Sequence, residues 1–552
     1  LHAQEEQRRL SSMSATRRKH LVGDFNERPG DETPGVGTPF TVLSLAAVNE
    51  LLQHAQCKQC GSPVTLSKTG REYGIAVKLV LTCDYCGELD AQWSSPRAGG
   101  NETCNPFEVN VLATRAVMST GNGQTVLNDI FSSLNVSQRG LHPKTFQKYV
   151  KKKLNPAAHV MSVCADAVKS VYSELNFGNP GNITVSYDGT WLTRGHSSHI
   201  CVGTVIELFT GYVLDFVVLS NFCLGCQLGP KDDDPHYEQW RADHQCQKNS
   251  LSKPGQMEVE AARILFERSL QKHGLRYTKM LCNGDSRASN NTHEEKVYGF
   301  VEIEKEDCIN HIHKRMGAAL RNLLQKHKGD SQKSLGGKDN LTGDLITKLS
   351  TYYERPLKAN QSNIDGMKNA VLATYHHVTS TDARSNHSLC PKGEDSWCIH
   401  NKAVAKEEPA PKHRYNLPDY VAEALLPIYT RLSDKKLLER CQRGKTQNAN
   451  ECLHSVIWSL VPKTKHASLY TVESAVGEAV ARFNAGKEHA TEAILKELHV
   501  NRSSILVQTC AEKDQRRLAA SDRKHAGAEN FRSVMKRKQG KTVDSDYVPG
   551  GF

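Results

Sequence analysis

The fold of this chain is decided by a short run in which apolar and polar residues alternate up to an aspartate: Ile183-Thr184-Val185-Ser186-Tyr187-Asp188-Gly189-Thr190-Trp191. Alternation with a period of two predicts a β-strand with one buried face. Two more β-rich runs follow at 199–208 and 212–219, with the turn-forming pair Thr210-Gly211 between them. Three successive strands with short turns predict an antiparallel meander.

The residues after the meander add a helix and a fourth strand. A helical run at 257–273 leads to a short apolar strand that ends at Asp285. Residues 307–440 are mainly helical, and a further helix carries Glu451 and stops before Pro462. These elements predict an α/β protein with a mixed sheet as its core and a mainly helical insertion.

Three carboxylates in this pattern form a candidate active site. In a mixed sheet of these strands, Asp188 and Asp285 can lie side by side, and Glu451 can complete the set from a helix packed on the sheet. Convergent carboxylates suit Mg²⁺ or Mn²⁺, hard cations that prefer oxygen ligands and keep positions open for water and phosphate. Two such ions about 4 Å apart can activate an attacking hydroxyl and stabilise the leaving oxygen. The pattern alone is compatible with a metal-dependent nuclease.

Each carboxylate also has a purely structural explanation. Asp188 precedes a glycine and can belong to a turn, and Asp285 can cap a helix. Asn448 and Glu451 have the spacing of a capping box, in which the glutamate serves only the helix end. On the sequence alone, these alternatives stay open.

Cysteine pairs at metal-ligand spacing form a second pattern. The chain has 17 cysteines and no secretion signal, which favours metal ligands over disulfides. Two CxxC pairs with a strand-like stretch between them predict a zinc ribbon within residues 37–104: Cys57, Cys60, Cys83 and Cys86. Four reduced cysteines without a metal are the alternative.

Two further cysteine and histidine sets are candidate zinc sites. A polar excursion at 221–254 contains Cys223, Cys226, His244 and Cys246. This excursion has few apolar residues, so a zinc ion would supply the missing stability, the alternative being a disordered loop. A looser third set comprises His377, His387, Cys390 and Cys398, with His400 as an alternative to His377.

The region 105–178 is predicted to be helical, helix-turn-helix-like and DNA-binding. Its third helix carries lysines at i, i+4, i+7 and i+8: Lys144, Lys148, Lys151 and Lys152. A basic face there suits phosphate or major-groove contact, and a solvated lysine face is equally compatible. The net charge of +11, from 71 basic and 60 acidic residues, also favours a polyanionic partner.

The two ends of the chain are expected to lie outside the core. Residues 1–36 are polar and charged and are predicted to be disordered. The chain begins at Leu1 and not at Met, as a fragment would. Residues 491–552 form a basic tail that suits nonspecific phosphate contacts or nuclear import. No run of 18 apolar residues occurs, which argues against a membrane span.

Several of these stretches together resemble the Mutator-like transposase domain, a DDE transposase with a ribonuclease H-like core. The resemblance runs from about residue 57 to residue 490. It rests on these motifs: Tyr187-Asp188-Gly189-Thr190-Trp191, Met257-Glu258 after the excursion, Gly284-Asp285-Ser286, Cys308-Ile309-Asn310-His311, Gly444-Lys445-Thr446-Gln447-Asn448-Ala449-Asn450-Glu451, and Trp458 with Pro462-Lys463.

The resemblance implies a fold, a reaction and a cofactor. Residues 179–306 and 441–490 would form the two parts of a ribonuclease H-like core, with 307–440 as the inserted helices. The three catalytic carboxylates would hold Mg²⁺ or Mn²⁺ for nicking transposon ends and joining them to target DNA. We expect a homo-oligomer on DNA, located in the nucleus.

Two questions stay open at this point. Cys308 and His311 lie one helical turn apart and suit either a metal, a role in steadying the site, or core packing. A domesticated relative that binds DNA without cutting it, and a host nuclease of the same fold, compete with an active transposase. The intact triad argues against the former, and the long helical segment before Glu451 argues against the latter.

Overall fold

The computed structural model describes residues 2–23, 37–100, 102–137, 139–151, 156–193, 197–283, 287–328, 334–337 and 339–539, with the backbone alone over 531–539. Two of the predicted site residues, Lys152 and Asp285, therefore lie outside the described residues.

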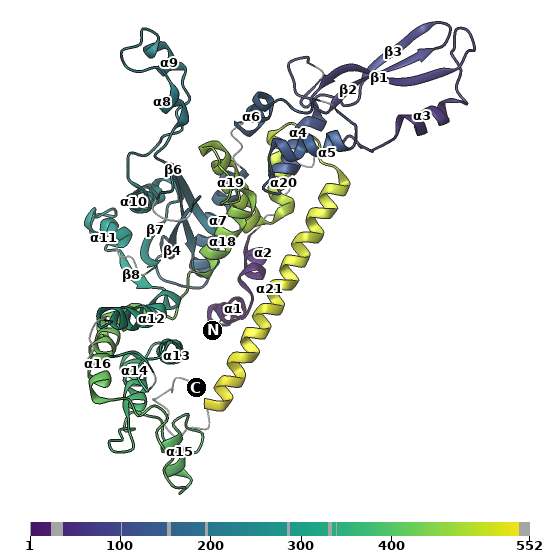
Figure 1. The fold of residues 1–552 in the computed structure, drawn as a ribbon. Coiled ribbons are helices and arrows are strands. Elements are labelled where there is room, and N and C mark those ends of the chain that lie inside the picture. The colour runs from purple at the N-terminus through teal and green to yellow at the C-terminus, as the bar shows by residue number, and fades with distance from the viewer. Residues whose placement is uncertain are drawn as a thin grey trace.

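A five-stranded mixed sheet forms the centre of the molecule (Figure 1). Its spatial order is β6-β5-β4-β7-β8, from the strands β4 (Asn182–Trp191), β5 (Ile200–Glu207), β6 (Val213–Ser220), β7 (Arg276–Cys282) and β8 (Glu304–Asp307). The strand β5 is antiparallel to both β4 and β6, which confirms the predicted meander, and β7 and β8 run parallel to β4.

Helices cover both faces of this sheet. On one face, Cys201 of β5 packs against Met257 and Ala261 of α10 (Pro254–His273). On the other, Ile200, Val202 and Ile206 of β5 meet α18 (Asn448–Leu460) and α19 (Leu469–Ala485). All eight residues of β5 are buried, as expected of a strand covered on both faces.

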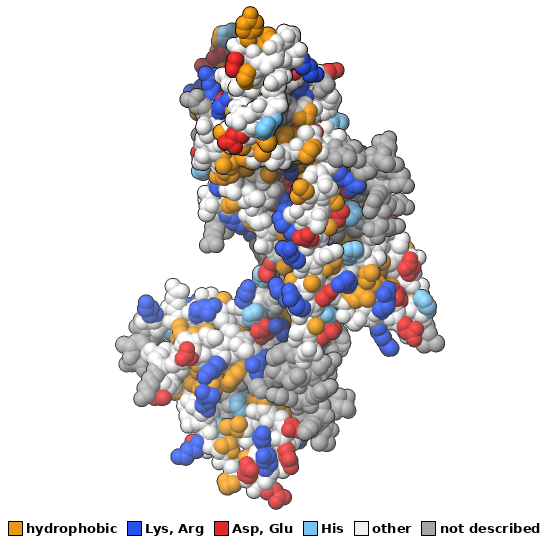
Figure 2. Space-filling model, turned by 90° about the vertical axis from the view of Figure 1, so that its right-hand side faces the viewer, with side chains coloured by type: hydrophobic (Ala, Val, Ile, Leu, Met, Phe, Trp, Pro, Cys, Tyr) orange, Lys and Arg blue, Asp and Glu red, His pale blue; other side chains and the backbone are white. Residues whose placement is uncertain are grey.

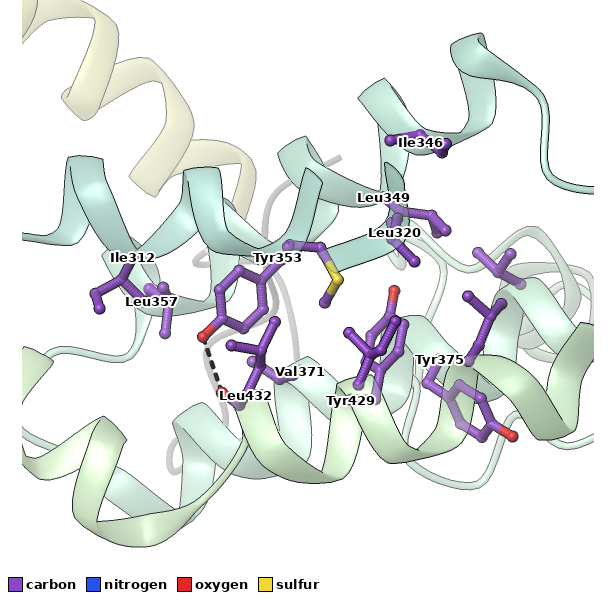
Figure 3. Close-up of a cluster of buried hydrophobic side chains, with 14 of the residues drawn as sticks. Ile312, Leu320, Ile346, Leu349, Tyr353, Leu357, Val371, Tyr375, Tyr429 and Leu432 are labelled. Atoms are coloured by element: carbon purple, nitrogen blue, oxygen red, sulfur yellow. Dashed lines mark hydrogen bonds between the residues drawn. The ribbon is translucent and has the colours of Figure 1, made fainter. Parts of the chain in front are cut away.

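The predicted helical insertion is a separate layer with its own hydrophobic core. Its helices are α12 (Ile309–Lys326), α13 (Gly343–Ala359), α14 (Ile364–Thr379), α15 (Ile399–Ala405), α16 (Asp419–Leu432) and α17 (Lys435–Cys441). Figure 3 shows aliphatic and tyrosine side chains from α12, α13, α14 and α16 converging, with the Tyr353 hydroxyl donating to the Leu432 carbonyl at 2.8 Å. The insertion is thus packed around its own buried side chains.

A three-stranded antiparallel sheet lies at the end of the molecule opposite the insertion (Figure 1). It consists of β1 (Val64–Tyr73), β2 (Ala76–Cys83) and β3 (Gly87–Trp93), with α3 (Leu45–Leu52) bound to β1 through Asn49. This is the sheet expected of a ribbon.

Four helices connect this sheet to the core: α4 (Glu108–Met118), α5 (Gln124–Ser133), α6 (Pro143–Lys151) and α7 (Pro156–Glu174). The first three share a small core, and Gly121 between α4 and α5 lies against the end of α18. A Cβ at this positive-φ residue would lie 2.5 Å from the Ser459 carbonyl oxygen, so only glycine fits. The three helices are as predicted, and their use as a helix-turn-helix stays a prediction.

The prediction of a disordered N-terminal tail is wrong for residues 2–23. They form α1 (His2–Ser11) and α2 (Ala15–Val22), and Leu10 and Lys19 are buried. The Lys19 ammonium donates to the Phe483 carbonyl at 2.8 Å and lies 3.5 Å from the Phe483 ring centroid. The polar composition of this segment did not indicate these helices, because long basic side chains can pack their aliphatic stems on apolar surface. Residues 24–36 lie outside the described part of the chain.

The predicted basic tail contains two helices, α20 (Lys487–Glu497) and the long α21 (Ser504–Gln539). Arg17 of α2 pairs with Asp522 of α21 at 2.6 Å, so the N-terminal helix α2 contacts this C-terminal helix. Across the described residues, no helix has both the length and the apolarity that a bilayer span requires.

Candidate active site and metal centres

Asp188 lies within β4 and not at its end as predicted, opposite Thr204 of β5. Only 16% of its side-chain surface is exposed, and its Oδ1 accepts a hydrogen bond from the Gly189 amide at 3.1 Å. Burial raises the pKa of Asp188 to about 7, and the charges of Glu258 and Glu451 add to this rise. The site is therefore one where a cation would relieve an unfavourable negative charge.

The helix α18 is fixed on β4 and β5 by polar contacts. The Ser186 hydroxyl donates to Asn450 Oδ1 at 2.6 Å, and the Trp458 indole donates to Thr190 Oγ1 at 2.8 Å. His454 Nδ1 lies 3.7 Å from Asp188 Oδ2. These contacts confirm that this helix packs on the strand that carries Asp188, and they leave Glu451 exposed at the margin of the site.

His454 is a neutral neighbour of Asp188 and not its ion-pair partner. Burial lowers the pKa of His454 to about 3, so its imidazole carries no charge at neutral pH. A neutral imidazole does not compete with a cation for the Asp188 carboxylate.

The capping-box explanation for Glu451 is wrong. The N-cap of α18 is Gln447, whose side-chain amide donates to the Tyr187 carbonyl at 2.7 Å. Asn448 is the first helical residue, and its Oδ1 accepts from Asn310 at 2.9 Å. Glu451 therefore has no part in a reciprocal cap with Asn448.

Cys308 and His311 lie at the start of α12, next to the loop that enters α18. Cys308 is buried, and its Sγ accepts from the Gln447 amide at 3.4 Å. The Ile309 amide donates to the Lys445 carbonyl at 3.2 Å. Neither Cys308 nor His311 belongs to a metal-binding group among the described residues. The contacts favour the steadying role for Cys308: it holds the segment that positions Glu451.

The second predicted aspartate, Asp285, lies outside the described residues, but the strand before it is described. β7 ends at Cys282 and pairs in parallel with β4 up to Leu281 opposite Ser186. The chain thus leaves β7 beside the part of β4 that carries Asp188. The next described helix, α11, spans Arg287–Glu294.

A fourth carboxylate, Glu258 of α10, lies beside Asp188; it belongs to the Met257-Glu258 motif but was not predicted as a site residue. A Cβ on Gly189 would lie 2.7 Å from Glu258 Cγ, so the glycine makes room for this side chain. Glu258 lines a small cavity with Tyr187, Cys282 and Arg287. The glycine after Asp188, within a buried strand, was the available signal of a close approach.

The ribbon cluster (Cys57, Cys60, Cys83 and Cys86) comes together as predicted. Its four sulfur atoms all lie within 4.8 Å of one another, with 3.4 Å between Cys60 and Cys83 and 4.0 Å between Cys57 and Cys86. Four thiolates around a tetrahedral zinc are roughly 3.8 Å apart. The cluster thus has the donor set and the size for a zinc ion.

The excursion cluster (Cys223, Cys226, His244 and Cys246) also comes together, on the short helices α8 (Leu224–Leu228) and α9 (Tyr237–Asp243) and their flanks. His244 Nε2 lies 3.3 Å from the sulfur atoms of Cys223 and Cys226, and the Trp240 ring stacks on His244 at 4.4 Å. Among residues 221–249 only Cys223 is buried. Hydrophobic burial therefore cannot hold this segment, and a metal can.

The insertion cluster (His377, His387, Cys390 and Cys398) has its donor atoms within 4.8 Å of one another. Cys390 Sγ lies 3.9 Å from His377 Nδ1 and 3.7 Å from His387 Nδ1. His377 is thus the fourth member of this set. His400 belongs instead to a second group, with His387 and His413.

The family comparison places these sites in a known class. A family model described as Mutator-like transposase matches residues 40–398. The chain belongs to the Mutator-like transposase family. The match contains the ribbon cluster, the excursion cluster and Asp188, and it ends before Glu451. Comparisons with curated proteins and with solved structures found no match.

In this Mutator-like chain, the predicted DNA-contacting lysines of α6 are exposed. Lys144, Lys148 and Lys151 lie opposite the buried Phe146 and Val150. Figure 2 shows Lys and Arg side chains dispersed among acidic and apolar ones on the face in view. The geometry permits phosphate contacts by α6 and leaves the solvated-face alternative open.

Proposed function

We propose that this protein is a metal-dependent DDE transposase that cuts transposon ends and joins them to target DNA. Asp188, Asp285 and Glu451 would hold Mg²⁺ or Mn²⁺. The observation that carries this proposal is the position of α18, which the Ser186–Asn450 and Thr190–Trp458 hydrogen bonds fix on the strand of Asp188. Family membership supports the class of reaction.

The fold supports a ribonuclease H-like core. Three antiparallel strands lead into a parallel β7, and the helical insertion separates that strand from α18. This is the order of elements that the resemblance implies.

The residues around Asp188 fit a divalent cation. Its oxygens are the donors that Mg²⁺ prefers, and Glu258 and Glu451 add negative charge to the same site. A bound divalent ion would activate the attacking hydroxyl and stabilise the leaving oxygen. In this proposal Asp188 supplies a rigid ligand from a buried strand, and Glu451 supplies one from a helix that Asn450 and Trp458 fix in place.

The remaining modules are proposed to bind DNA and zinc. The ribbon cluster and the excursion cluster would hold structural zinc ions, and the α4–α6 region would contact DNA through its exposed lysines. Assembly as a homo-oligomer on DNA in the nucleus completes the proposal.

The test is Mg²⁺-dependent nicking of duplex DNA that carries the sequences flanking the coding region. Glu451→Gln should keep the fold and DNA binding and reduce nicking at least about a hundredfold, because charge donated to the metal is worth several kcal/mol. The matched control is Glu423→Gln, an exposed helical glutamate of α16, which should nick like the wild type.

Two outcomes would contradict the proposal. Nicking by Glu451→Gln at the wild-type rate would place the third carboxylate elsewhere, with Glu473 the next candidate. Glu478 is a poorer one because it pairs with Arg115 and Arg482. Wild-type protein that binds this DNA without nicking it would favour the domesticated, non-cutting alternative.

A further inference from the structure

The end of α14 and the segment between it and α16 hold four histidines and two cysteines at one end of the insertion. They fall into two overlapping groups that share His387: the insertion cluster, and a second set of His387, His400 and His413. The question is whether the second set is another metal site or part of the first.

The geometry of His387 and His413 is that of a hydrogen bond. Their Nε2 atoms lie 3.1 Å apart, their ring planes differ by 8°, and their centroids are 5.3 Å apart. The centroids are farther apart than the Nε2 atoms by about the width of one ring, as expected when both nitrogens lie on the line between the centroids. The two nitrogens therefore point at each other. A metal between them, at about 2.0 Å from each, would spread such collinear nitrogens to roughly 4 Å.

His400 lies across both rings instead of pointing a nitrogen at them. Its ring stacks on His387 at 4.2 Å and 11°, and on His413 at 4.0 Å and 19°. Stacked rings present their faces to each other, whereas a metal requires the in-plane lone pair of each nitrogen. The second set is therefore a hydrogen-bonded pair with a third ring packed on it.

The proton positions along this pair follow from Asp382. Its Oδ1 lies 2.8 Å from His413 Nδ1 and also accepts from the His413 amide at 2.8 Å. A carboxylate can only accept, so Nδ1 of His413 carries the proton and its Nε2 is the acceptor. His387 then donates from its own Nε2, which leaves a lone pair on Nδ1.

That lone pair faces the cysteines. His387 Nδ1 lies 3.7 Å from Cys390 Sγ and 3.6 Å from Cys398 Sγ. Protein contacts also hold the loop, because Asn401 Nδ2 lies 3.1 Å from each of the carbonyl oxygens of His387, Cys390 and Pro391 and shares its two N–H groups among them. The donor set of two thiolates and two imidazoles matches zinc.

We propose that the insertion cluster is a third zinc site, and that Asp382 and His413 are positioning residues that fix the ring orientation and tautomer of its ligand His387. Outer hydrogen bonds of this kind orient metal-bound histidines and typically change metal affinity by about 10–100-fold. The site fastens the loop after α14 to α15, beyond Val378, the last residue of α14 in the hydrophobic core of the insertion. This inference does not depend on DNA cleavage.

The experiment measures zinc on the full-length protein. Wild-type protein should hold one equivalent more than Cys398→Ser. His413→Ala and Asp382→Ala should keep the full stoichiometry at saturating zinc but release this one equivalent to a competing chelator at about 10–100-fold lower chelator concentration. With Co²⁺ in place of zinc, both variants should show the wild-type thiolate-to-cobalt absorption, which exceeds that of Cys398→Ser by the contribution of the insertion cluster; this excess shows that the ligands of the cluster are intact.

The matched control is His400→Phe, which keeps a ring in the stack and removes its nitrogens. It should bind zinc like the wild type. Loss of zinc in His400→Phe with retention in Cys398→Ser would overturn the assignment in favour of the all-histidine site. Unchanged zinc affinity in both His413→Ala and Asp382→Ala would overturn the positioning role.

Discussion

Two buried aspartates on the same sheet have opposite surroundings. Asp215 of β6 is fully buried and paired with Arg268 and Lys272 of α10, at 2.7 Å and 2.6 Å. Burial alone would raise the pKa of Asp215, but His273 and these two cations hold it well below its usual range. At Asp188, in contrast, burial and the charges of Glu258 and Glu451 act in the same direction, upward.

The difference separates a structural carboxylate from a functional one. The charge of Asp215 is neutralised within the chain, so it stabilises the fold and has no capacity for a ligand. The charge of Asp188 is opposed by its neighbours, and the 16% of its side chain that remains exposed gives a cation access. Carboxylates whose negative charges destabilise the metal-free fold are typical of a metal-binding site.

The largest effect is expected from Asp215→Asn. This change leaves Arg268 and Lys272 without their carboxylate and should lower the free energy of unfolding by about 2–3 kcal/mol, below the range of a fully buried pair because both cations reach solvent. Urea unfolding at pH 7 measures it. The difference should shrink as the pH falls from about 4 toward the depressed pKa of Asp215. Equal stability of variant and wild type at pH 7 would contradict the structural role.

A smaller effect is expected from pH on metal binding. The pKa of Asp188 lies above the value near 4 of an unfolded aspartate, so its ionisation destabilises the metal-free fold as the pH rises from about 4 to 7. A cation competes with the proton, so Mn²⁺ affinity should rise about tenfold from pH 6 to pH 8. Calorimetric titration at both pH values tests this, and a pH-independent affinity would argue that Asp188 is not the ligand.

The smallest effect on global stability is expected from Cys226→Ser. The excursion lies between β6 and α10, the two elements that hold Asp215, yet it buries almost nothing. Loss of its zinc should make residues 221–249 sensitive to protease and leave the main unfolding transition unchanged. Elemental analysis should show one equivalent less zinc. A large drop in the main transition would mean that the core depends on this metal.

The sequence predicted the helices, strands and cysteine clusters better than it predicted the contacts between distant residues. Alternation in 183–191 identified β4 and the meander, because burial of every second side chain makes apolar and polar residues alternate along the sequence. CxxC spacing identified the ribbon and excursion clusters for a similar reason: ligands on one knuckle must be neighbours in the sequence.

The remaining features depend on contacts between distant residues. Asn448 and Glu451 had the spacing of a capping box, but the N-cap is Gln447, whose side chain bonds to the distant Tyr187 carbonyl. Glu258 joins the site only because α10 crosses Gly189. The tail helix α1 packs Leu10 on Val171 and Leu175, and α2 contacts Phe483 and Asp522. Local composition reveals none of these contacts.

The measurement that tests the central claim most directly is thermal unfolding of wild type, Asp188→Asn and Asp215→Asn at pH 8, with and without Mn²⁺. Without added metal, Asp188→Asn should unfold at a higher temperature than the wild type, because it removes a charge that its neighbours oppose. Mn²⁺ should raise the midpoint of the wild type and of Asp215→Asn but not that of Asp188→Asn. An Asp188→Asn protein that is less stable than the wild type, and that Mn²⁺ stabilises equally, would contradict the account.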